Sequence, residues 1–186
     1  MVRYIQVLLL LLLCGCDLFK VREAEKPVKP PLWNSFYTTW QLSLQNLEYS
    51  YEDERNVVKY SEIFTSNFRF YFAQQDINDY GINLTWTRDN ERDMLYNLDN
   101  WADSIRVDFS EIPDQHDDID VNVVRLYRNY NLTVWRQGRA QQYAGKMDVQ
   151  MRLDNGFWRI ESWYDYRVST TPQLPTWGKL KYDFAV

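Results

Sequence analysis

Residues 143–167 read YAGKMDVQMRLDNGFWRIESWYDYR, and they contain the clearest strand pattern in the chain. Between Tyr143 and Leu153, apolar, aromatic or small residues occupy every second position. Such a period of two predicts a strand with one buried face. Asn155-Gly156 is a favoured pair for a two-residue hairpin turn, and a second alternating segment, residues 158–162, follows it. The stretch therefore predicts two antiparallel strands joined by a tight turn.

The same alternation marks three earlier segments. Residues 68–72, 105–109 and 124–134 place apolar or aromatic side chains at nearly every second position. Residues 113–120, PDQHDDID, are polar and predict a turn between the last two of these segments. The second half of the chain therefore predicts four strands that follow one another as a meander.

The first half of the domain has a helical period instead. Aromatic residues and leucines recur every three or four positions across residues 33–51, which predicts a helix with one buried face. A shorter helix is expected over residues 53–64, and a third begins after Thr87, a favoured N-cap residue. Residues 74–86 are polar, contain a glycine and predict a loop. The order predicts an α+β domain in which a curved antiparallel sheet of about five strands packs on these three helices.

The N-terminal stretch MVRYIQVLLLLLLCGCDLFK predicts a processing signal. Its apolar run is shorter than the roughly 20 residues that a membrane-spanning helix needs, and it follows a basic residue, as in a signal peptide. Leu13-Cys14-Gly15-Cys16 looks like a bacterial lipobox, with Cys16 as the residue that receives the lipid. The alternatives are a short core helix, an ordinary secretory signal, and a Cys14–Cys16 disulfide of strained geometry.

These patterns divide the chain into four parts. We expect a lipoprotein signal peptide at residues 1–15, and the lipidated cysteine with a flexible tether at residues 16–31. The folded domain is expected at residues 32–168. A C-terminal tail, residues 169–186, is expected to pack on the domain through Trp177 and Leu180.

Composition narrows the classes of partner. The chain carries 21 Lys and Arg against 26 Asp and Glu. An acidic domain is repelled by phosphate backbones, so no nucleic-acid partner is expected. The 8 Trp and 14 Tyr supply large amphipathic rings that can fill a core, line a pocket or cover an interface.

The element order resembles that of the NTF2-like superfamily, which includes ketosteroid isomerase and the SnoaL-like proteins. The resemblance rests on the aromatic first helix, the short helix that runs into NFRFYF, the helix after the TW pair, and the closing segment GFWRIESWYDYR. That closing segment looks like the final strand of many members, including bacterial lipoproteins of no assigned activity. The resemblance implies a cone whose cavity lies between the concave face of the sheet and the helices. Cystatin-like and lipocalin-like sheets are the alternatives.

In the resembling enzymes, carboxylates and a tyrosine, or a His–Asp pair, act inside the cone. The alternation in this chain directs Tyr130, Tyr143 and Ser162 inward. If the same alternation continues along the last strand, Tyr164 also faces inward. The alternation does not determine on which face of the sheet Asp165 lies, because a bulge near the end of the strand would exchange the two faces. The sequence therefore predicts no catalytic constellation and no cofactor.

The only histidine, His116, lies in the acidic turn at residues 113–120. This turn lacks the glycine and glutamate of an EF-hand loop and has too few histidine and cysteine ligands for zinc, so no metal site is predicted.

We expect a lipid-anchored protein of the bacterial cell envelope, on the periplasmic or outer face, that works as a non-enzymatic binding or assembly module. The alternatives are a small-molecule binder that uses the cone cavity and a SnoaL-like isomerase, cyclase or hydratase. The expected partners are the lipid bilayer through acylated Cys16, a second copy or another envelope protein, and an apolar small molecule. The candidate pocket or partner residues are Tyr127, Tyr130, Trp135, Tyr143, Ser162, Trp163, Tyr164 and Asp165.

Overall fold

The computed structural model describes residues 30–53 and 55–185, and residues Pro31–Val186 make up one compact unit. The predicted signal peptide and Cys16, and the predicted tether as far as residue 29, lie outside the described residues. The elements follow in the order α2 (Trp40–Glu52), α3 (Val57–Glu62), β1 (Phe64–Tyr71), α4 (Gln74–Tyr80), β2 (Thr85–Trp86), α5 (Arg88–Trp101), β3 (Ser104–Glu111), β4 (Asp118–Ile119), β5 (Val123–Arg136), β6 (Arg139–Asp154), β7 (Phe157–Tyr166) and α6 (Trp177–Asp183).

The strands form one curved sheet in the order β2-β1-β7-β6-β5-β3, with β4 paired to β5 outside this path. The predicted meander is confirmed, because β3, β5, β6 and β7 pair antiparallel in turn. The predicted hairpin turn is also present, with φ of 51° at Asn155 and 83° at Gly156. One pairing differs from the prediction: β1 lies parallel to β7, so the sheet is mixed. A period of two sets which face is buried, but it carries no information on strand direction between segments far apart in the chain.

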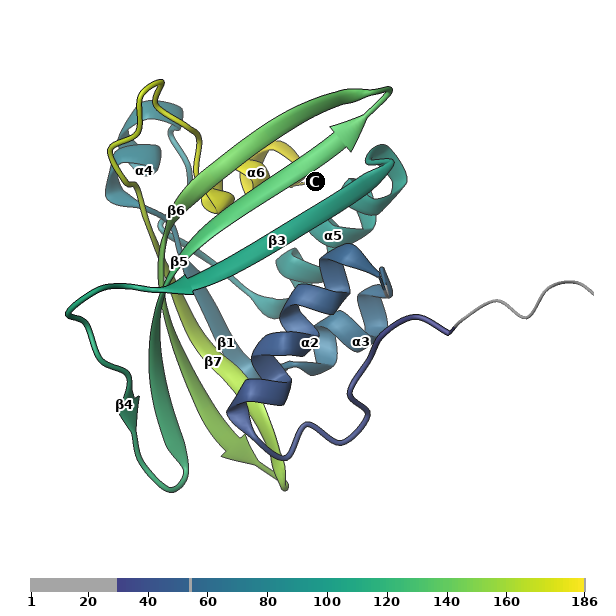
Figure 1. Cartoon of the computed structure of the whole chain (residues 1–186), viewed down its shortest axis with the longest axis vertical. Helices are drawn as coiled ribbons and strands as arrows, with labels where there is room; N and C mark the ends of the chain where they lie inside the picture. Colours follow the sequence, from purple (N-terminus) through teal and green to yellow (C-terminus); the bar gives the residue numbers. More distant parts are fainter. Residues whose placement is uncertain (1–29, 54, 186) are drawn as a thin grey trace, which may run out of the picture. The chain divides into compact units, whose positions relative to one another are not determined.

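Helices α2, α3 and α5 lie against one face of the sheet (Figure 1). Helix α5 begins directly after its N-cap residue Thr87, as predicted, and Asn90 completes the capping box. Its apolar stripe of Met94, Leu95 and Leu98 is fully buried. Within residues 30–53 and 55–185, no helix is long and apolar enough to cross a membrane.

One helical boundary differs from the prediction, and two helices occur in segments for which none was predicted. Helix α2 begins at Trp40 instead of residue 33, because the Thr39 hydroxyl accepts a hydrogen bond from the Leu42 N–H and caps the helix there. Phe36 lies before the helix with 76% of its surface exposed. The segment predicted as a loop, residues 74–86, contains helix α4, which ends at a left-handed Gly81, and strand β2. The tail contains helix α6.

A bulge on β7 changes which residues of this strand face the helices. Gln150 pairs with Ser162 while Met151 pairs with Ile160, so Glu161 is an extra residue on β7. A bulge of one residue exchanges the two faces of a strand. Trp163 and Asp165 are therefore buried among the helices. The prediction that Ser162 and Tyr164 face inward is wrong, because both lie beyond the bulge on the other face.

Candidate functional site: the interior and the helix that fills it

The space between the sheet and the helices is occupied by α6. The side chains of Trp177, Leu180 and Lys181 are all fully buried. The Trp177 ring meets Trp163 edge to face, with centroids 4.7 Å apart, and Tyr51 at 5.1 Å. The Trp177 Nε1–H donates to the Tyr51 hydroxyl at 3.2 Å. Aromatic side chains of the protein itself therefore fill the interior, and α6 occupies the cavity that the resemblance implied.

A buried ion pair fixes the middle of α6. Lys181 Nζ lies 2.5 Å and 2.6 Å from the two carboxylate oxygens of Glu91 on α5. The same carboxylate accepts hydrogen bonds from the Tyr60 hydroxyl at 2.6 Å and from Trp86 Nε1–H at 2.8 Å. Burial lowers the pKa of Lys181 to about 8, and the Glu91 carboxylate opposes this shift. The pair leaves both charges satisfied in an apolar environment.

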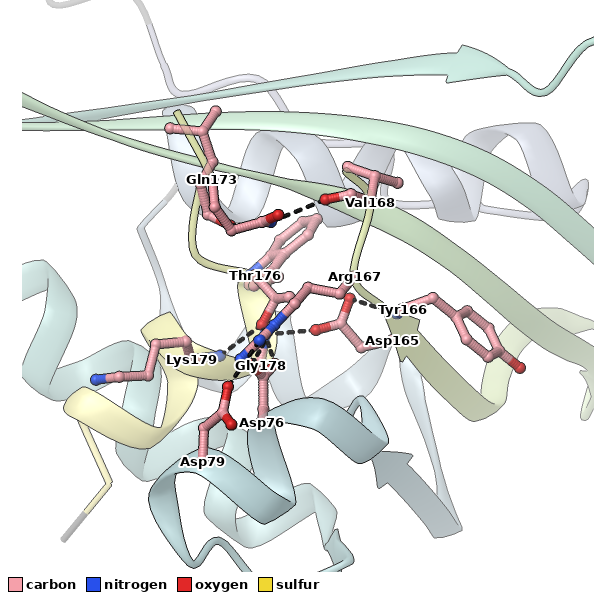
Figure 2. Close-up of polar contacts among 12 residues, drawn as sticks. Asp76, Asp79, Asp165, Tyr166, Arg167, Val168, Gln173, Thr176, Gly178 and Lys179 are labelled. Carbon is pink, nitrogen blue, oxygen red and sulfur yellow. Dashed lines mark hydrogen bonds and ion pairs between the residues drawn. The ribbon is translucent and has the colours of Figure 1, made fainter. Parts of the chain in front are cut away.

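A second carboxylate holds the first turn of α6. Asp165 Oδ2 accepts a hydrogen bond from the Gly178 N–H at 2.7 Å, and Asp165 Oδ1 accepts one from the Tyr130 hydroxyl at 2.7 Å. The Tyr130 oxygen in turn accepts from the Trp177 N–H at 2.8 Å. Burial raises the pKa of Asp165 to about 6, against the effect of these hydrogen bonds. Figure 2 shows the Asp165 carboxylate directed at the start of the helix.

A third carboxylate, Asp76 on α4, is also fully buried. It accepts hydrogen bonds from the Thr176 hydroxyl, at the N-cap of α6, and from the Arg167 guanidinium at the end of β7 (Figure 2). Arg167 also pairs with the more exposed Asp79, at 2.7 Å. Three carboxylates from three elements thus bind α6 or the segment that leads into it.

Close packing at the first turn of α6 depends on a glycine. A Cβ at Gly178 would lie 2.8 Å from Asp165 Oδ2 and 3.0 Å from Phe72 Cδ1. No side chain larger than hydrogen fits there unless a neighbour moves.

A surface groove of about 350 Å³ runs between α2 and β3, next to this interior. Trp40, Leu44, Phe109 and Arg128 contribute to its walls. The Phe109 ring also stacks against Trp177, with centroids 6.0 Å apart, so Phe109 contacts both the groove and the helix that fills the interior.

The predicted site residues fall on opposite faces of the sheet. The alternation of β5, β6 and β7 buries one group on the face toward the helices and leaves the other half-buried on the far face, which we call the outer face. The inner group is Tyr130, Tyr143, Trp163 and Asp165, and the outer group is Tyr127, Trp135, Ser162 and Tyr164. Tyr130, Trp163 and Asp165 come together around α6. Cys16 lies outside the described residues.

Sequence reasoning missed Glu91, Lys181 and Asp76. Glu91 lies in the first turn of α5, where an acidic side chain is favoured without any specific partner, and Asp76 lies in the segment that predicts a loop. The only local indication was the spacing of the tail, where Lys181 follows Trp177 by four positions and so shares its helical face.

His116 is exposed, and its neighbour Asp117 pairs with Arg128 at 2.6 Å. The part of the chain that the structure describes contains no group of three or more His, Cys, Asp or Glu side chains placed to hold a metal ion.

Solved structures of other proteins share this architecture. A conserved protein from Planctomyces limnophilus matches with a TM-score of 0.57 and 11% identity, over 68% of this chain and 91% of that one. A candidate scytalone dehydratase from Novosphingobium aromaticivorans matches with a TM-score of 0.55 and 12% identity, over 73% and 89%. A protein of unknown function from Mycobacterium tuberculosis matches with a TM-score of 0.54 and 15% identity, over 71% and 72%.

No protein-family model matches the chain, and no curated protein matches its sequence. At the identities of the solved structures, the likeness shows the fold alone. Together with the element order, it shows that the described part of the chain has an NTF2-like fold, as the resemblance implied.

Proposed function

We propose that this protein is a lipid-anchored module of the bacterial envelope that binds or assembles with another protein and does not catalyse a reaction. One observation carries the proposal: the three interior carboxylates Asp76, Glu91 and Asp165 all bind α6 or its leading segment. A general base must reach the proton that it removes, and none of these three is open to a substrate while α6 is in place.

The outer face of the sheet is the working surface in this proposal. Tyr127, Asp148, Tyr164 and Tyr71 lie in register across β5, β6, β7 and β1. Tyr71 and Tyr164 stack face to face, with centroids 4.2 Å apart and an angle of 6° between the rings. Arg125 pairs with Asp148 over the same row. Tyrosine and arginine are enriched in protein interfaces, and tyrosine buries a large area there at low cost in side-chain entropy.

A hollow of about 290 Å³ lies at one end of this row. Tyr127, Lys146, Asp148 and Tyr166 line it, and Tyr166 is 46% exposed. The charges of the outer face have both signs, so the face is suited to a second copy of itself as well as to a different protein.

Site-specific photo-crosslinking in bacterial cells tests the surface. A photoreactive phenylalanine at Tyr166, on the outer face, is compared with one at Tyr96, a tyrosine on α5 that is 60% exposed. We expect a discrete adduct from position 166 and none from position 96. An adduct at twice the mass of the chain identifies a second copy, and any other mass identifies an envelope partner. Equal products from both positions, or none, would contradict the proposal.

A second candidate function is proton-transfer chemistry of the dehydratase or isomerase type. Asp165 favours it, because burial holds the pKa of this carboxyl at about 6 and the Tyr130 hydroxyl lies 2.7 Å away. The reaction would require α6 to leave. Exchange of solvent deuterium into the α-carbon of cyclic ketones, lost in Asp165→Asn, would support this candidate over the module.

A further inference from the structure

Helix α6 is held by its surroundings and not by its own helical stability. It has 7 residues, whereas isolated helices shorter than about 12–15 residues are marginal in water. The segment that leads into it is exposed at its centre, around Thr171 and Gln173. The order of α6 therefore comes from the interior, and the helix relates to the interior as a bound peptide relates to its receptor.

The interior has a subsite for an ammonium group. Lys181 Nζ lies 4.1 Å from the ring centroid of Phe70 and 3.9 Å from that of Trp163. Both oxygens of Glu91 accept from it. Two aromatic faces and one carboxylate around a cation are the features with which proteins recognise ammonium ligands.

An aromatic subsite lies directly beside it. The Trp177 indole is surrounded by the rings of Trp163, Tyr51 and Tyr130, with centroids between 4.7 and 5.3 Å away. The Tyr51 hydroxyl accepts from the indole N–H. This subsite is suited to a flat aromatic ring, and the Tyr51 hydroxyl can accept a hydrogen bond from an N–H group on that ring.

The distance between the two subsites defines a class of ligand. Lys181 Nζ lies 5.9 Å from the Trp177 ring centroid. In α6 the two groups come from different residues, but a linker of two or three carbons can carry both on one small molecule. An apolar ligand would fill only the aromatic subsite and would leave the Glu91 carboxylate buried without a cation, which is strongly unfavourable.

We propose that the interior is a binding site for arylalkylamines, molecules with an aromatic ring and a primary ammonium separated by a short linker, and that α6 is its built-in occupant. An external amine and α6 compete for the same contacts. The apparent affinity of the wild-type protein for the amine is therefore the intrinsic affinity multiplied by the fraction of molecules in which α6 has left the interior. The inference is independent of the outer face, so either proposal can fail without the other.

The first test removes the built-in groups. The double variant Trp177→Ala/Lys181→Ala of the full chain, in detergent micelles, is titrated calorimetrically with tryptamine. Indole-3-propionate serves as the control, because it carries the same ring with the opposite charge. We expect tryptamine to bind the variant more tightly than the wild type. We also expect a preference over the acid of roughly tenfold or more, the value of one charge-assisted hydrogen bond. Adding Glu91→Gln should remove this preference.

A second measurement uses the unmodified protein, in case the double variant does not fold. Hydrogen exchange of the wild-type chain is followed with and without tryptamine. We expect faster exchange at the amides of α6, residues 177–183, and unchanged exchange in β6. A folded variant that binds neither compound, or binds both equally, would overturn the proposal. If the double variant does not fold, hydrogen exchange in α6 of the wild-type chain that is unchanged by tryptamine would likewise overturn the proposal.

Discussion

The ion pair between Lys181 and Glu91 gives a quantitative test of how α6 is held. Both side chains have 0% exposure. Lys181→Met keeps much of the length of the side chain and removes its charge, so that the Glu91 carboxylate stays buried without a cation. Glu91→Gln does the reverse. The double variant Glu91→Gln/Lys181→Met removes both charges together.

The expected magnitudes follow from the contacts of each partner. Breaking a buried pair costs about 3–5 kcal/mol of unfolding free energy. Lys181→Met should lie near the lower end, because Glu91 keeps its hydrogen bonds from Tyr60 and Trp86. Replacing both charges is often neutral, so the double variant should recover about 2 kcal/mol or more relative to the less stable single variant.

Urea unfolding at neutral pH, followed by tryptophan fluorescence and by circular dichroism, measures these free energies. Lys179 and Asp183 supply the matched control, since they form an ion pair four residues apart on the same helix but partly exposed. Lys179→Met should cost less than about 0.5 kcal/mol. If the effects of the two single substitutions at the buried pair simply add, the pair does not fasten α6 and the reasoning is refuted.

Three further predictions concern the helix, the interior and the anchor. Gly178→Ala should lower the melting temperature. Overpacking against Asp165 and Phe72 costs about 1–3 kcal/mol, which exceeds the gain in helix propensity of about 1 kcal/mol. A higher melting temperature would contradict the close fit. Burial raises the pKa of Asp165 from 3.8 to about 6, so the folded state binds more protons and stability should fall as pH rises through this window, by up to roughly 3 kcal/mol. Urea unfolding at several pH values checks this, and Asp165→Asn should flatten the slope. Cys16→Ser should abolish incorporation of radiolabelled fatty acid whereas Cys14→Ser should not; the opposite result would move the lipid to Cys14.

The strands were predictable because their pattern is local. Each of the long strands of the meander has one face toward the helices, so apolar residues recur with the period of the pleat. Helix α4 was not predictable in this way. Of its seven residues, only Asp76 is fully buried, and that carboxylate is held by Arg167, which lies 91 positions away in the sequence. A helix that is fastened by a distant ion pair shows no apolar stripe.

The buried ion pair of the interior could not be predicted for the same reason, because its two partners lie far apart in the sequence. Charged residues are rarely buried unless they are paired, so a sequence with no view of the partner favours a solvated position for Glu91 and Lys181. The two lie 90 positions apart. The aromatic half of the site left a clearer pattern, because Trp177 and Leu180 recur at helical spacing in a segment otherwise rich in polar residues and proline.

One inserted residue links these features. Without Glu161 as a bulge, the alternation that starts at Trp158 would continue and would direct Ser162 and Tyr164 into the interior. With the bulge, Trp163 and Asp165 take those places, and both contact the first turn of α6. The same shift turns Tyr164 outward, where it stacks on Tyr71. A single irregularity in β7 therefore supplies the acceptor that holds the helix inside and the aromatic row that the outer face offers to a partner.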